Sequence, residues 1–185
     1  MFHTPHYAAP IGDLTTVKNP YQNIGDIIVV TDNDNGGYKR LKYVKIQDLS
    51  GSVTVRDGSA VMYCDVSGVQ SKTTVSPDIS GGTAAASLQA AGVVMAANES
   101  GAVGSASVTA VYGWILIEGY HANVLTGGSV SVDDPVACGG ADGKVATQSG
   151  TYAATHPLRF IGTALATDAG SPTTSPCYVN VLMKH

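Results

Sequence analysis

Charged side chains are scarce in this 185-residue chain. They make up 13% of its residues, roughly half of the ~25% that soluble domains usually carry. Glutamate occurs only at Glu99 and Glu118. Long helices use Glu, Lys, Gln and Arg on their exposed faces, so this scarcity argues against a helical bundle. We therefore expect no helix longer than about ten residues.

The chain also lacks a basic surplus, a long apolar run and a cysteine framework. Its net charge of −4 gives no attraction to nucleic acid or to an anionic membrane, so we expect neither as a partner. There is no run of about 18 apolar residues and no recognisable secretory signal. Cys64, Cys138 and Cys177 are widely spaced and odd in number, which predicts reduced thiols.

Glycine and β-branched residues are abundant instead, with 22 Gly in the chain. Short strand-like runs separated by Gly, Asp and Pro predict an all-β fold, a small β-sandwich or barrel-like domain. The acidic, Gly-rich segment 32–37 predicts a hairpin turn. Segment 83–97 is compatible with a short helix at its start, but 92–97 favours a buried strand. The expected strands are 24–31, 38–46, 52–56, 60–66, 92–97, 108–120, 160–166 and 178–182.

Residues 1–23 differ from the rest of the chain. They hold Pro5, Pro10 and Pro20 and show no strand or helix period, which predicts an extended N-terminal arm without a core of its own. Residues 24–185 form the β-rich domain. We expect the arm to be ordered mainly by a neighbouring subunit. Its candidate contact residues are Phe2, His3, Tyr7 and Tyr21.

Motifs that carry catalysis or metal binding are incomplete. No GxSxG nucleophile elbow occurs. Segment 139–144 resembles a phosphate-binding loop, but it is one residue short and Val145 replaces the Ser or Thr that contacts Mg²⁺. Segment 32–43 resembles a calcium loop, yet Tyr43 stands where a bidentate Glu is needed. We therefore expect no catalytic residue, no metal and no cofactor, and a protein that is not an enzyme.

One local charge anomaly stands out, a basic cluster between two tyrosines. One interpretation is a solvated strand whose lysines discourage edge pairing. The other is a contact with an acidic partner surface. The cluster consists of Lys39, Arg40, Lys42 and Lys45.

The single tryptophan allows a further interpretation. Trp114 with Tyr112 and Tyr120 is compatible with a stacking surface of a carbohydrate-binding β-sandwich. Strand alternation, however, places Tyr112, Trp114 and Leu116 on one face, which favours a role in the core. A carbohydrate-binding module remains the alternative function.

Spaced glycine, tryptophan and apolar segments follow one another in a definite order from residue 24 to 185. In this order the chain resembles the head decoration, or capsid cement, proteins of tailed bacteriophages. The segments are Gly25-Asp26 before a strand, the 32–37 turn into Tyr38-Lys39-Arg40-Leu41-Lys42-Tyr43-Val44-Lys45, Tyr112-Gly113-Trp114-Ile115-Leu116-Ile117-Glu118-Gly119, Gly127-Gly128, Asp142-Gly143-Lys144-Val145 and Ile161-Gly162-Thr163-Ala164-Leu165.

The resemblance implies a structural virion protein. Such proteins bind the outer surface of an assembled lattice of major capsid protein and stabilise it, commonly as homo-oligomers, and a trimer is favoured here. It also implies assembly in the bacterial host cytoplasm and a final location on the capsid exterior. Contacts through the arm and the basic cluster then multiply over the lattice. A major capsid or tail-tube subunit is a less favoured alternative, because the former usually needs a long helix.

Overall fold

The computed structural model describes residues 14–15, 18, 22–47, 55–66, 69–79, 89–96, 110–139, 141–148, 157–168 and 174–181. Within these ranges the regular elements are β-strands and one 3-10 helical turn, so the predicted all-β fold is confirmed. The elements are β1 (Ile27–Thr31), β2 (Tyr38–Gln47), β3 (Ala60–Val66), β4 (Val69–Ser76), β5 (Ala90–Met95), β6 (Ala110–Leu125), β7 (Pro135–Cys138), β8 (Val145–Thr147), η1 (Pro157–Arg159), β9 (Phe160–Ala164) and β10 (Thr174–Asn180).

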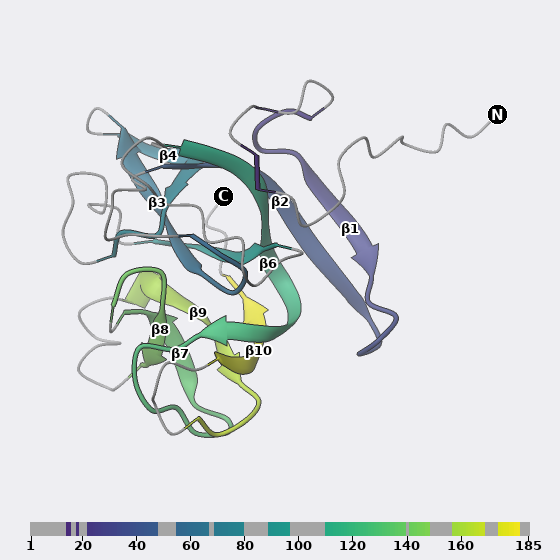
Figure 1. Ribbon diagram of the computed structural model, residues 1–185, viewed down its shortest axis with the longest axis vertical. Helices are drawn as coiled ribbons and strands as arrows, with labels where there is room; N and C mark the ends of the chain where they lie inside the picture. Colours follow the sequence, from purple (N-terminus) through teal and green to yellow (C-terminus); the bar gives the residue numbers. More distant parts are fainter. Residues whose placement is uncertain are drawn as a thin grey trace.

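Five of the strands close into a β-barrel, which forms the upper part of the molecule in Figure 1. Around the barrel the order is β2, β4, β3, β5, β6 and back to β2. The β2–β4 pairing is parallel, and the other four are antiparallel. The barrel-like architecture expected from the sequence is therefore present, with further strands outside it.

A second ring of strand pairings lies below the barrel. After leaving β2, strand β6 pairs with β10, and the sheet continues through β9 and β7 to β8. Thr126, the residue after β6, forms a parallel bridge with Val145 of β8, and this bridge closes the second ring. Strand β6 thus belongs to both rings, and Figure 1 shows it running from the upper strands into the lower ones.

The passage of β6 between the rings requires a local irregularity. The β2–β6 register shifts between Arg40 and Leu41, so that Ile117 is an extra residue on β6. Gly119 follows with a φ of 125°, a conformation that residues with a Cβ rarely adopt. A Cβ at Gly119 would lie 2.8 Å from the carbonyl oxygen of Tyr38. Glycine is therefore needed where β2 crosses β6.

Alternation along the barrel strands creates two hydrophobic clusters. One takes members from all five barrel strands and fills the barrel, with Val44, Ile46, Val61, Val75 and Ile115 among them. The other joins the opposite faces of β2, β5 and β6 to the buried side chains of β7–β10. Each fully buried Leu, Ile or Val contributes about 1.5–3 kcal/mol through removal of its side chain from water. The second cluster therefore holds the two rings together.

Most strands expected from the sequence are found. The 32–37 turn joins β1 to β2 as a hairpin, and both Gly36 and Gly37 have positive φ, as such a turn requires. The buried strand expected at 92–97 is β5. Of the expected strand 52–56, the structure describes only Val55 and Arg56, and Val55 forms a bridge. The start of segment 83–97 lies outside the described residues.

The last strand begins earlier than expected. The sequence predicts a Pro-containing turn near Pro172 and Pro176 and a strand at 178–182. Pro172 lies outside the described residues, and β10 starts at Thr174 and includes Pro176. The register of β10 against β6 shifts between Ser175 and Cys177, so the proline sits in a bulge. A bulge tolerates proline because the residue there needs no N–H for the ladder.

The loop before β3 is fitted closely against the junction of the rings. Gly58 donates its N–H to Val94 of β5 and accepts the N–H of Leu125 at the end of β6. It has a φ of 78°, and a Cβ there would overlap the carbonyl oxygen of Asn123. Gly36 has nearly the same φ of 73° but open space around it.

Substitution of these two glycines separates steric overlap from backbone strain. We expect Gly36→Ala to cost about 1 kcal/mol, the cost of a left-handed conformation. Gly58→Ala should cost about 3–4 kcal/mol, because overlap with backbone adds to the same strain. Urea unfolding of both variants measures the difference, and equal losses would contradict the close fit of the loop.

Candidate functional site

The basic cluster on β2 does not lie at a sheet edge. β2 pairs with β1 and β4 on one side and with β6 on the other, so the edge-strand interpretation is wrong. Lys39 forms an ion pair with Asp32 at 3.2 Å, and Arg40 forms one with Glu118 at 3.0 Å. Two of the four cationic groups are therefore neutralised within the chain.

Lys42 is buried within the chain. Its side chain points into the end of the barrel, where Nζ donates to the carbonyl oxygen of Lys72 at 2.6 Å and to the Tyr63 hydroxyl at 3.1 Å. Burial lowers the pKa of Lys42, and the charge of Lys72 lowers it further. Strand alternation sends Lys42 to the same side as Val44, so it does not belong to the expected contact set.

The remaining expected contact residues divide into two groups. Lys45 is partly buried, and its backbone pairs with Thr74 and Tyr112. Four residues lie outside the described part of the chain, namely Phe2, His3, Tyr7 and Tyr21. Of the expected arm, Leu14 packs against the barrel core, and Thr15 exchanges two backbone hydrogen bonds with Tyr112.

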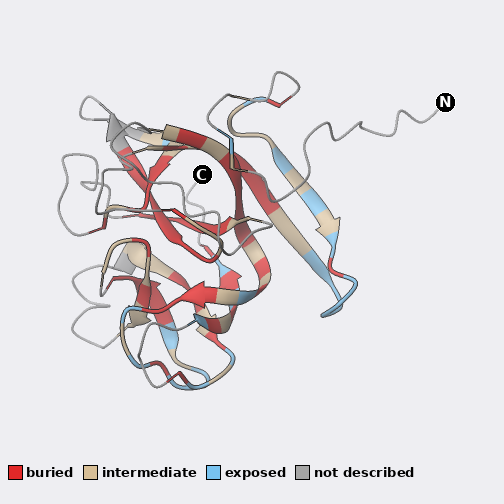
Figure 2. Cartoon of the chain, viewed as in Figure 1, coloured by how far each residue is buried: buried red, intermediate tan, exposed pale blue. Residues whose placement is uncertain are grey.

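A different surface emerges from the positions of the exposed hydrophobic residues. The six large ones are Ile27, Val29, Tyr38, Val132, Leu165 and Tyr178. All except Val132 lie on one side of a continuous sheet of β1, β2, β6, β10 and β9, which we call the outer face. Figure 2 shows exposed residues along β1 and the turn of its hairpin.

Strand register places the members of the outer face side by side. Val29 is opposite Arg40, Arg40 is opposite Glu118, and Glu118 is opposite Asn180. Directly opposed residues share a face of a sheet. Tyr178 lies two residues before Asn180 and is therefore on the same face. Leu165 follows β9 and donates its N–H to Pro176, which extends the face to that strand.

A polar network sits in the middle of the outer face. The Tyr38 hydroxyl donates to Glu118 Oε1 at 2.7 Å, and Arg40 Nη1 donates to Oε2 at 3.0 Å. The bond from Tyr38, supported by that from Arg40, holds the pKa of Glu118 below its ordinary value of 4.5. In turn, Glu118 raises the pKa of Tyr38. The network presents a paired charge among apolar side chains.

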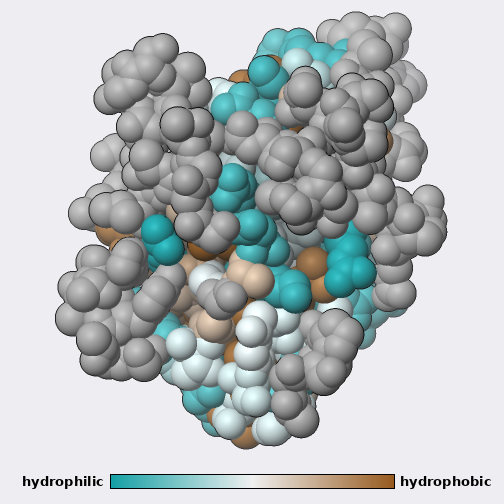
Figure 3. Space-filling view, turned by 60° about the vertical axis from the view of Figure 1, so that its left-hand side comes forward, coloured by the Kyte–Doolittle hydropathy of each residue, from teal (hydrophilic) through white to brown (hydrophobic). Residues whose placement is uncertain are grey.

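Figure 3 shows the molecule turned by 60° from the view of Figure 1. Among its coloured residues, hydrophobic side chains lie in small groups between hydrophilic ones. On the outer face, the strand registers bring five large exposed hydrophobic residues together. The outer face is therefore the candidate functional site.

The expected stacking platform around Trp114 is not exposed. Trp114 is only 2% exposed, and its ring lies 5.3 Å from that of Tyr43. Tyr112, Trp114 and Leu116 all contribute to the hydrophobic cluster that joins the rings. The prediction that alternation puts these three residues on a core-facing side is confirmed.

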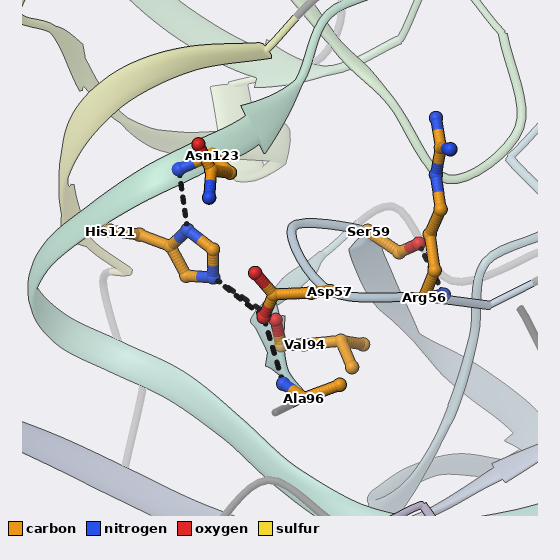
Figure 4. Close-up of polar contacts among 7 residues, drawn as sticks. All are labelled: Arg56, Asp57, Ser59, Val94, Ala96, His121 and Asn123. Atoms are coloured by element: carbon orange, nitrogen blue, oxygen red, sulfur yellow. Dashed lines mark hydrogen bonds and ion pairs between the residues drawn. The ribbon is translucent and has the colours of Figure 1, made fainter. Parts of the chain in front are cut away.

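A buried histidine forms a second polar cluster, shown in Figure 4. The side chain of His121 is only 3% exposed. Its Nδ1 accepts the N–H of Asn123 at 3.0 Å, so the proton of the neutral ring is on Nε2. Nε2 lies 3.3 Å from Asp57 Oδ1 and 3.2 Å from the Val94 carbonyl oxygen.

The polar groups of this cluster contact other groups of the same chain. Asp57 Oδ1 also accepts the N–H of Ala96 at 2.8 Å, and Ser59 Oγ accepts the N–H of Arg56 at 3.0 Å. Both nitrogens of His121 and the carboxylate of Asp57 therefore have structural partners. The contacts bind the loop before β3 to β5 and β6 at the junction of the rings.

In the part of the chain that the structure describes, no three His, Cys, Asp or Glu side chains gather closely enough to share a metal ion. None of the described segments is a helix with the length and hydrophobicity needed to cross a bilayer. The thiols of Cys64, Cys138 and Cys177 are buried and form no disulfide. Burial raises the pKa of Cys138 and Cys177 to about 12.

No protein-family model, curated protein or solved structure matches this chain.

The outer face was not foreseen from the sequence, because it depends on pairings between distant strands. A local signal did exist for part of it. Ile27 and Val29 alternate with Ile28 and Val30, so one apolar pair had to face away from the core.

The network on the outer face makes a pH-dependent contribution to stability. The folded carboxyl of Glu118 has a pKa below 4.5, so its contribution is present above about pH 4.5 and is lost as the pH falls through the lower folded value. Glu118→Gln should therefore be slightly less stable than wild type at neutral pH, and the gap should close on acidification. Urea midpoints over a pH series measure this, with Tyr38→Phe as a partial control; a gap independent of pH would contradict it.

Proposed function

We propose that this protein is a structural component of a tailed-bacteriophage head that binds the outer surface of the assembled capsid lattice and stabilises it. The order of glycine, tryptophan and apolar segments over residues 24–185 supports this function. In this proposal the protein performs no chemistry. It acts as a homo-oligomer that presents the same surface to equivalent positions of the lattice.

The observation that carries the proposal is the gathering of five exposed hydrophobic residues on the outer face. Soluble monomers rarely expose contiguous apolar patches larger than roughly a few hundred Å², and patches above that size mark interaction sites. Tyrosine and arginine are enriched at protein interfaces because they combine apolar area with hydrogen bonding. Tyr38, Arg40 and Tyr178 give the outer face this composition.

The charges of the face suit attachment to a protein surface. Arg40 and Glu118 neutralise each other at 3.0 Å, so the face can bind without leaving an isolated charge between the partners. Hydrophobic contact then supplies most of the attraction. The ion pairs of Lys39 and Arg40 also argue against the acidic-surface mechanism expected from the basic cluster.

Rigidity is the second requirement of a lattice-binding protein, and the fold supplies it. Both rings close through β6, so the outer face is built on strands that are paired within a continuous sheet. A preorganised surface loses little conformational entropy on binding. Repetition over a lattice then converts contacts of moderate affinity into stable attachment.

The proposal is tested by mixing the purified protein with undecorated capsids and with unassembled capsid subunits of its phage, followed by pelleting and imaging. We expect saturable binding to assembled capsids, with much weaker binding to free subunits. Raising the salt concentration should change the affinity little, because the cationic groups of the face are already paired. Equal affinity for free subunits, or no saturable attachment, would contradict the proposal.

Matched variants locate the binding surface in the same assay. Tyr178 and Val132 are 44% and 54% exposed, and only Tyr178 lies on the outer face. Tyr178→Ser should weaken capsid attachment at least tenfold, which is the order of effect of an interface anchor. Val132→Ser should leave it unchanged. Equal effects of the two substitutions would place the contact elsewhere.

A further inference from the structure

We propose that β1 pairs with β1 of a second copy of this chain, antiparallel and about a two-fold axis. The first observation is that β1 is the one described strand with a neighbour on one side only. The barrel closes through β2 and β6, and even β8 has the bridge to Thr126 on its second side. Among the described strands, β1 is therefore the one without any pairing on its second side.

The backbone groups on the open side of β1 can be assigned from its hydrogen bonds. Asp26 accepts the N–H of Tyr43 at 2.9 Å, and Asp32 donates its N–H to Gly37 at 3.2 Å. In an antiparallel pair, alternate residues direct both backbone groups to the same neighbour. The even-numbered residues therefore bond to β2. The N–H and C=O groups of Ile27, Val29 and Thr31 point to the open side.

The sequence of β1 does nothing to prevent pairing at this edge. Natural proteins protect an exposed edge with lysine, proline or a bulge. Residues 27–31 contain no charge, no proline and no glycine, and their register with β2 is unbroken. Ile27 and Val29 are 44% and 60% exposed. Such a strand is a template for addition of another strand.

A second copy satisfies the edge better than an unrelated strand, because β1 is complementary to itself. A register centred on Val29 places Val29 opposite Val29 of the second copy and Ile27 opposite its Thr31. Every outward N–H and C=O of residues 27, 29 and 31 then has a partner. Residues 27–31 carry no charge. Beyond the two ends of the strand, Asp26 comes opposite Asp32 of the second copy, and the ion pair of Asp32 with Lys39 at 3.2 Å reduces the repulsion between these carboxylates.

The two-fold arrangement also explains why such an edge need not cause aggregation. An isologous contact uses the same patch on both copies and closes after one pairing. No unpaired edge remains for a third copy. The outer faces of the two copies then join across the axis into one broader sheet surface. This inference concerns self-association alone and holds whether or not the protein binds a capsid. It replaces the trimer that the resemblance favours with a two-fold dimer.

The test is sedimentation equilibrium of the full chain, without capsids, over a range of concentrations. We expect a reversible assembly of two copies. Val29→Pro removes an N–H that points to the open side and spares the ladder to β2, so it should raise the dimer dissociation constant at least tenfold. Val29→Thr keeps that N–H and should remain dimeric. Circular dichroism checks that each variant is folded.

Val29→Lys provides a second variant if the proline substitution unfolds the chain. It should also raise the dissociation constant, whereas Val132→Lys, at a similarly exposed valine outside the outer face, should not. A wild-type protein that is monomeric throughout, or trimeric, would overturn the proposal. So would a folded Val29→Pro or Val29→Lys variant that dimerises as tightly as wild type.

The register itself is tested by cysteine substitution. The three native cysteines are buried, so Val29→Cys adds an exposed thiol. Paired residues on the two-fold axis have Cα atoms about 5.5 Å apart, within the range for a disulfide. With oxidised glutathione, Val29→Cys should form a covalent dimer far faster than Val132→Cys. Equal rates would contradict the register centred on Val29.

Discussion

The sharing of β6 between two rings is the constraint on which the rest of the structure depends. Its first part pairs with β2 and β5 inside the barrel, and its last part, from Glu118 to Leu125, pairs with β10. One strand can serve both rings only if its register changes between them. The extra residue Ile117 and the positive φ of Gly119 make that change possible. The contacts of Gly58 and His121 then fix the loop before β3 at the same junction.

The outer face is a direct consequence of this change of partners. Within the barrel, Lys42 and Val44 lie on the inward side of β2. Arg40 has the same alternation, but it lies where β2 extends past the barrel and meets Glu118 on the outside of the second ring. The same side of one strand is therefore buried at one end and exposed at the other. That exposed end pairs with β1 on one side and with β6 on the other, and β6 pairs with β10 at the same point. These pairings create the surface proposed to bind other proteins.

The sequence could predict turns and single strands, which depend on neighbouring residues. It could not predict contacts that depend on pairing between strands far apart in the sequence. The 32–37 turn and the apolar run around Trp114 were recognisable because glycine positions and alternation are short-range signals. The start of β10 was not predicted, because proline usually ends a strand and Pro176 is accommodated by the bulge against β6. The basic cluster looked like one surface, since its members are neighbours in sequence. In the fold, Lys39 pairs with Asp32 across its own hairpin. Alternation and the distant partners Glu118 and Tyr63 give Arg40 and Lys42 separate roles.

Native-state hydrogen exchange tests the central claim, that β6 couples the two rings, most directly. If they form one cooperative unit, the slowest amides of β6 on either side of Gly119 should exchange with the same free energy, equal to that of global unfolding. Gly119→Ala should lower both values together. Exchange of the β6–β10 amides at a much lower free energy than the β2–β6 amides would contradict the account, because it would show that the second ring opens independently of the barrel.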